Sequence, residues 1–110
     1  ENLDPKKYFT EFSTAGSCNY AFTLVIKNKD DELRKSVIAK LQSLNVEFRR
    51  GTAGGGNQLR QPYCKNLNLK YGPEDFPNVD YIHFYGLYIG NYPTLNEEKI
   101  YILCDHLNKI

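Results

Sequence analysis

Residues 20–50 read YAFTLVIKNKDDELRKSVIAKLQSLNVEFRR, and they hold two predicted strands on either side of a predicted helix. Residues 20–27 are apolar, aromatic or β-branched at nearly every position, which predicts a strand that is central in its sheet or covered on both faces. Residues 46–50 alternate apolar and polar side chains, which predicts a second, short strand. The two strands are parallel if they are neighbours, but a third strand inserted between them is equally allowed.

The segment between these strands carries the clearest helix signal in the chain. Its apolar residues recur at three- and four-residue spacing, as on one face of an amphipathic helix. Asp30 or Asn28 can cap the start of this helix, and Asn45 suits the left-handed position that ends it. The apolar stripe consists of Leu33, Val37, Ile38, Leu41 and Leu44.

The second half of the chain predicts a helix, a strand and a final helix. Residues 76–85 carry a proline suited to the first helical turn, and Gly86 ends that helix. Residues 87–90 are the third short strand. The last helix begins after Thr94 or Asn96 and runs to the end of the chain.

The element order β-α-β-loop-α-β-α predicts an α+β fold, a two-layer sandwich in which helices pack on a small three-stranded sheet. A length of 110 residues fits one domain. We expect residues 1–19 to be a lead-in or interdomain segment outside the core, and residues 20–110 to be the domain itself. The chain starts at Glu1 and has no Met, which predicts a start produced by processing, design or truncation.

Composition is that of an ordinary soluble domain, with 41% hydrophobic and 25% charged residues. The net charge of +1 gives no reason to expect a nucleic-acid partner, and no apolar stretch is long enough for a membrane span. Three widely spaced cysteines and two histidines argue against a disulfide framework and against a metal site. A reducing cytoplasm is the simplest setting.

The candidate binding segment is the loop at residues 49–63, RRGTAGGGNQLRQPY. Glycines let backbone amides approach an oxyanion, and arginine forks bind phosphate, so the loop suits a nucleotide diphosphate. Its spacing matches neither a P-loop nor GxGxxG, and a mobile surface loop explains the glycines equally well.

No catalytic set is visible in the sequence. His83 stands beside aromatic residues and is interpreted as a packed histidine, and Cys64 as a buried structural thiol. Five acids begin predicted helices, where capping explains them without catalysis: Asp30, Asp31, Glu32, Glu97 and Glu98. The sequence therefore predicts no catalytic, cofactor-binding or metal-binding residue in this chain.

Three separated segments resemble the DegT-type sugar aminotransferases and, among them, the sugar 3-dehydratases that make 3-deoxysugars. They are VEFRRGTAGGGNQLRQPY at residues 46–63, DYIHFYGLYIGNYPTLNEEKI at residues 80–100, and NYAFTLVIKN at residues 19–28. The resemblance covers residues 18–110. The loop reads AGGGN where the dehydratases have a shorter AGN, so transamination and dehydration both stay open.

The resemblance implies a fold-type-I enzyme whose large N-terminal domain holds pyridoxal or pyridoxamine phosphate and carries the catalytic Lys or His. This chain would be the C-terminal small domain, separated from that large domain, of an enzyme that is usually a homodimer. The implied substrate is a nucleotide-diphospho-sugar of the 4-keto-6-deoxyhexose type, and the isolated piece would be inactive. The residues that would face the substrate are Arg50, Asn57, Arg60, Gln61 and Asn91.

Two other interpretations stay open on the sequence alone. The chain is a self-contained module that binds a nucleotide or another anion with the glycine-rich loop, or it is a non-catalytic interaction domain. The truncated-enzyme interpretation predicts that the chain alone binds no cofactor and that an apolar face rich in tyrosine is left uncovered.

Overall fold

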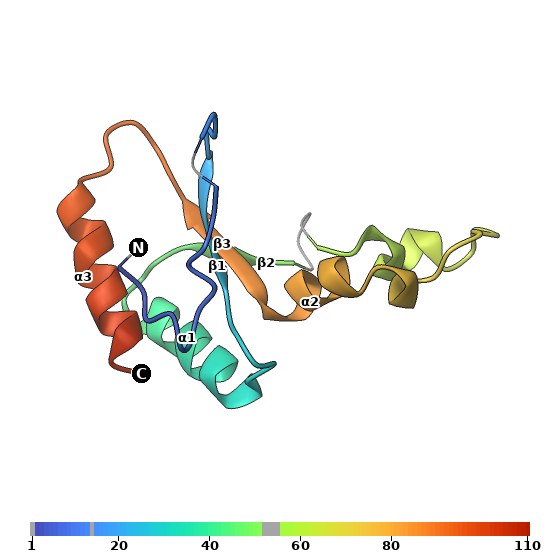
Figure 1. The fold of residues 1–110 in the computed structure, drawn as a ribbon, viewed down its shortest axis with the longest axis horizontal. Helices are drawn as coiled ribbons and strands as arrows, with labels where there is room; N and C mark the ends of the chain where they lie inside the picture. The colour runs from blue at the N-terminus through green and yellow to red at the C-terminus, as the bar shows by residue number, and fades with distance from the viewer. Residues whose placement is uncertain (1, 14, 52–55) are drawn as a thin grey trace.

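The computed structural model describes residues 2–13, 15–51 and 56–110. A sheet of three strands, β1 (Ala21–Val25), β2 (Phe48–Arg50) and β3 (Gly86–Gly90), lies at the centre of the molecule (Figure 1). The helices are α1 (Asp31–Ser43), α2 (Pro77–Tyr85) and α3 (Glu97–Asn108). The α+β class and the three predicted strands are confirmed. Within the described part, no helix has the length and apolar character needed to cross a bilayer.

Strand β3 lies between β1 and β2 and pairs antiparallel with both. The strands β1 and β2 therefore run in the same direction without touching, which is the inserted-strand alternative. Of the two alternatives for the first strand, the central position is wrong, because β1 is at the edge of the sheet. At the Val25 end, the backbone edge of this strand pairs with the N-terminal segment, whose Tyr8 bridges Ile26.

The core lies between one face of the sheet and the helices α1 and α3. The predicted stripe supplies Val37 and Leu41, both fully buried. Asp30 is the residue that caps α1, since its Oδ1 accepts from the Leu33 amide at 2.8 Å, and Asn45 has the expected positive φ of 53°. The buried cluster consists of Tyr8, Leu24, Ile26, Val37, Leu41, Leu87, Leu103 and Leu107.

The lead-in segment contributes to this core, so the expectation that it lies outside is wrong. Tyr8 has no exposed surface, and its hydroxyl donates a hydrogen bond to the Leu107 carbonyl at 3.0 Å. Burial raises the pKa of Tyr8 to about 12. A lone tyrosine in a polar segment has no periodic pattern, which is why the sequence did not indicate its role.

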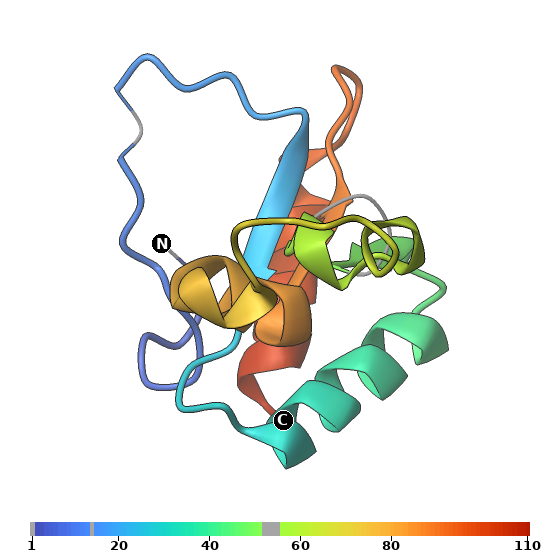
Figure 2. The same cartoon turned by 90° about the vertical axis from the view of Figure 1, so that its right-hand side faces the viewer.

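Residues 57–84, which we call the apolar arm, project from the sheet (Figure 1), and Figure 2 views the molecule from the side of the arm. The arm holds short 3-10 helices at Gln58–Arg60, Pro62–Cys64 and Pro73–Asp75, followed by most of α2. None of its apolar side chains is buried. The exposed large apolar residues of the arm are Tyr63, Leu67, Leu69, Tyr71, Phe76, Val79, Ile82 and Phe84.

Candidate functional site

The described ends of the glycine-rich loop, Gly51 and Gly56, lie directly against helix α2. A Cβ added at Gly51 would stand 2.6 Å from the Cα of His83, and one added at Gly56 would stand 2.8 Å from the same atom. Both positions therefore require glycine because of close backbone approach. His83 is 6% exposed, which confirms it as a packed histidine. Residues 52–55 of the predicted loop lie outside the described residues.

Asn57 is buried at the base of this loop, with 2% of its surface exposed. Its Nδ2 donates to the Pro73 carbonyl at 3.0 Å and to the Asp80 Oδ1 at 3.2 Å. Its Oδ1 accepts from the Leu59 amide at 3.1 Å and so caps the first 3-10 helix. The amide nitrogen of Asn57 thus holds the loop to α2, while its oxygen orders the turn that follows Asn57.

Arg60 reaches the same carboxylate from the outside. Its Nε and Nη2 donate to the two oxygens of Asp80, and the Nη2–Oδ2 distance is 2.8 Å. The guanidinium also lies over the ring of Phe84, 4.9 Å from its centroid. Hydrogen bonding from Arg60 holds the pKa of Asp80 below its usual value, and the Asn57 amide acts in the same direction.

The other predicted residues are more scattered. Gln61 follows Arg60 directly, and Arg50 ends β2 opposite Leu87, on the sheet face that α1 and α3 cover. Asn91 lies beyond the other end of β3, four residues or roughly 13 Å of extended chain from Leu87. Its Nδ2 donates to the Asn19 carbonyl at 2.8 Å. The structure therefore brings Asn57, Arg60 and Gln61 together and places Asn91 apart.

Sequence reasoning missed Asp80, which organises this cluster. The sequence gives it no role of its own, and in the structure it stands in the first turn of α2, where an acid is favourable even without a partner. Nothing local in the sequence connects it to Arg60, twenty positions earlier. A charge pair at that separation can be found only from the fold.

The described residues do not fit a resident pyridoxal phosphate. No described lysine is buried, so none has the enclosed setting that suits covalent attachment of the cofactor. Burial raises the pKa of the Cys104 thiol. Cys64 was predicted to be a buried structural thiol, and the structure places it half-buried. No three His, Cys, Asp or Glu side chains in the described part lie close enough together to hold a metal ion.

No family model and no curated protein matches the chain. A solved structure does match: GDP-4-keto-6-deoxymannose-3-dehydratase with a trapped PLP-glutamate geminal diamine, at a TM-score of 0.66 and 26% identity. The chain is related in structure to a PLP-containing sugar dehydratase. The match covers 80% of this chain and 22% of the dehydratase chain, so the chain spans less than a quarter of that enzyme.

Proposed function

We propose that this chain is the small, substrate-facing domain of a PLP- or PMP-dependent enzyme that acts on a nucleotide-linked 4-keto-6-deoxyhexose. The observation that carries the proposal is the likeness to the sugar 3-dehydratase over 80% of the chain. That likeness favours 3-dehydration, with transamination as the second candidate reaction. The same proposal includes a two-layer packing of helices on the sheet, as in a fold-type-I small domain. It also includes a parent enzyme that is a homodimer.

The apolar arm supports this proposal from the structure. A segment with no buried apolar side chain gains little from the hydrophobic effect, which is the main term that offsets the entropy of ordering a chain. Its large exposed side chains instead form a surface of the kind that other domains cover. We propose that the cover is the large, cofactor-bearing domain of the same enzyme.

The candidate site would contribute binding and orientation. When bound in the parent enzyme, the cofactor supplies the electron sink for the chemistry at the sugar. Asn57 and Asp80 hold the loop on α2, and Asp80 takes the Nε and Nη2 of Arg60, so that no described residue uses its Nη1. We propose that this nitrogen, Gln61 and Arg50 contact the nucleotide diphosphate, and that Asn91 contributes from the far end of β3.

The coding DNA upstream of Glu1 tests the proposal most directly. We expect an in-frame large domain that carries a cofactor-anchoring Lys, for an aminotransferase, or a His in its place, for a dehydratase. An in-frame stop codon close to Glu1 would contradict the proposal. An absorbance titration gives a second readout, since the 110-residue chain alone should form no stable stoichiometric adduct with pyridoxal phosphate.

The substrate contacts are tested in the longer enzyme by Arg50→Ala and Gln61→Ala. Each variant should raise KM for the nucleotide sugar by about tenfold, the usual effect of losing one hydrogen bond to a charged group. Arg49→Ala is the matched control, because Arg49 pairs with Tyr88 on the opposite face of the sheet. Unchanged KM in both test variants would remove these residues from the site. Micromolar binding of GDP-mannose by the 110-residue chain alone would instead favour a self-contained module.

A further inference from the structure

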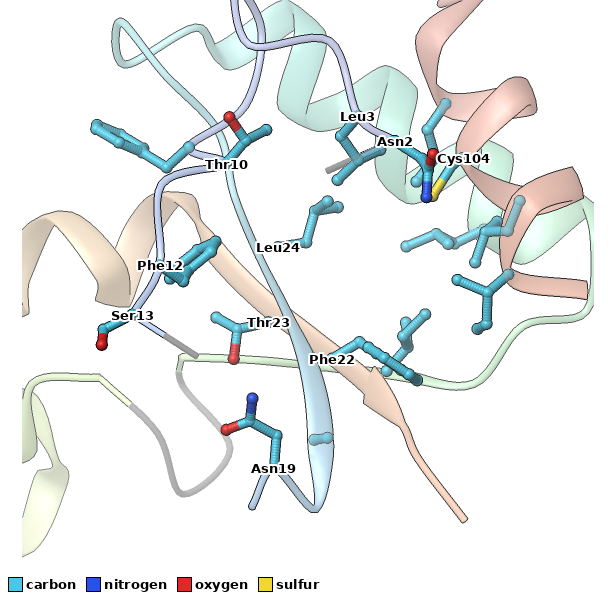
Figure 3. A pocket seen from close by; sticks show the side chains of 17 residues that line it. Asn2, Leu3, Thr10, Phe12, Ser13, Asn19, Phe22, Thr23, Leu24 and Cys104 are labelled. Atoms are coloured by element: carbon cyan, nitrogen blue, oxygen red, sulfur yellow. The ribbon is translucent and has the colours of Figure 1, made fainter. Parts of the chain in front are cut away.

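An apolar pocket of about 490 Å³ opens beside strand β1. Its walls come from α3, from β1 and from the N-terminal segment (Figure 3). Its lining includes the buried side chains of Leu24, Leu103 and Leu107, and also Phe12 and Phe22, which are 55% and 38% exposed. Both rings leave much of their apolar surface in contact with water, so burying them against the pocket lining would be favourable.

The backbone groups along the outer edge of β1, away from β3, are only partly hydrogen-bonded to the N-terminal segment. The Ile26 amide donates to the Tyr85 carbonyl at 3.0 Å, and the Tyr20 carbonyl accepts from the Asn91 amide. The backbone N–H and C=O groups of the even-numbered residues of this strand therefore point towards β3. Because the direction of backbone groups alternates along a strand, the N–H and C=O groups of Thr23 and Val25 point away from β3, towards the open edge. Val25 accepts from the Phe9 amide at 2.9 Å. No backbone hydrogen bond in the described part joins Thr23 to the N-terminal segment.

The N-terminal segment begins an antiparallel ladder with β1 and then leaves it. Tyr8 bridges Ile26, and the amide of Lys27 donates to the Lys7 carbonyl at 2.8 Å. The same register, extended by three residues, would set Glu11 opposite Thr23 as a hydrogen-bonded pair. It would also set Phe12 opposite Phe22, so the continuation has a defined geometry.

Side-chain alternation makes this continuation favourable. Tyr8 points into the core on the α1 and α3 side of the sheet. In an extended strand every second residue shares that face, so Thr10 and Phe12 would follow Tyr8 while Glu11 would point to the other face. Phe12 would then enter the pocket beside Phe22 and Leu24.

We propose that residues 10–13 form a strap that closes onto β1 as a fourth strand of the sheet. The strap is tethered on both sides, by the Phe9–Val25 hydrogen bond and by the Asn91 side chain that holds the Asn19 carbonyl at 2.8 Å. Closing fills the pocket and pairs Thr23 with Glu11, and opening exposes an apolar groove next to α3. This switch is independent of the proposed enzyme function.

Amide hydrogen exchange of the 110-residue chain tests the strap. In the closed state the amides of Glu11 and Thr23 are protected, and the Phe12 amide, which points away from β1, exchanges freely. Glu11→Pro removes the donor, while Glu11→Ala keeps it. We expect Thr23 to exchange at least about tenfold more slowly in E11A than in E11P. Equal rates in the two variants, or no protection of Glu11 and Thr23 in the unmodified chain, would overturn the proposal.

Cross-linking gives a readout that does not depend on the proline variant. Opposed residues of a hydrogen-bonded pair have Cα atoms about 5.5 Å apart, within the range of about 4.4–6.8 Å that a disulfide spans. With the native cysteines replaced by serine, Glu11→Cys with Thr23→Cys should form an intrachain disulfide under mild oxidation. The control, Ser13→Cys with Thr23→Cys, is out of register and should react at least about tenfold more slowly. Equal rates contradict the register, and a disulfide between two chains shows that a second copy, not the strap, pairs with β1.

Discussion

Arg60 and Asp80 form a two-pronged ion pair that joins the loop after β2 to helix α2. The pair stands over Asn57, which donates to the same carboxylate. This arrangement makes Asp80 the common partner of the two loop side chains, and the stability of the loop therefore follows the charge of Asp80.

Asp80→Asn should destabilise the chain at neutral pH, because the charge-assisted hydrogen bonds from Arg60 are lost. The pKa of Asp80 is lowered from its usual 3.8 in the folded state, so its contribution is present above that value and disappears as the pH falls through the lower folded value. The Tm difference between the native chain and D80N should be largest at pH 5–7 and shrink below about pH 4. Thermal unfolding across this range measures it, with Asp105→Asn on α3 as control. A difference that stays constant down to pH 2 would contradict the assignment.

Asn57→Ala should cost about 1–3 kcal/mol of unfolding free energy, because it leaves buried groups of the loop without partners. Asn57→Asp should cost more at neutral pH, since it sets a second carboxylate beside Asp80. Asn68→Ala, at an exposed position of the same arm, is the matched control and should be near neutral. Urea denaturation at pH 7 compares the three variants. If N57A and N68A were equally stable, Asn57 would not hold the loop.

Gly51→Ala should cost about 1–3 kcal/mol, because its new methyl group meets the backbone of His83 and one of the two elements must move. Gly90→Ala is the control, since a Cβ at Gly90 meets no atom within 4 Å. Thermal unfolding of both variants measures the contact. A G51A chain as stable as G90A would show that the loop does not press on α2.

Tyr8→Phe should cost about 1 kcal/mol at neutral pH through the lost hydrogen bond to Leu107. The folded-state pKa of Tyr8 is raised from 10.0 to about 12, so its neutral hydroxyl stabilises the fold below pH 10 and this stabilisation is lost as the pH rises towards 12. Y8F should therefore lose less stability than the native chain between pH 9 and about 11.5. Urea unfolding as a function of pH tests this, with Tyr101→Phe on the exposed face of α3 as control. Parallel curves for Y8F and the native chain would count against it.

The sequence was sufficient for elements whose signals are local. Helix α1 was predicted from its spacing, its Asp30 cap and the left-handed Asn45, all within one short segment. Strand order was open because pairing is a non-local property, and β3 shows little sequence signal despite its central place. The same limit applies to the site, since the partner of Arg60 and the hydrogen bond from Tyr8 to Leu107, 99 positions apart, depend on the fold as a whole.

The apolar arm has no core of its own, and this changes what its stability means. Apolar contacts with a surface that covers such a segment would replace the contacts that a core makes in other segments. Ordering of the arm and binding of that surface would then be one coupled equilibrium. For a cover on a separate molecule, the ordered fraction of the arm rises with the concentration of that molecule by mass action. For a cover on the same polypeptide, the two surfaces unfold as one cooperative unit, and a substitution in either one loosens both.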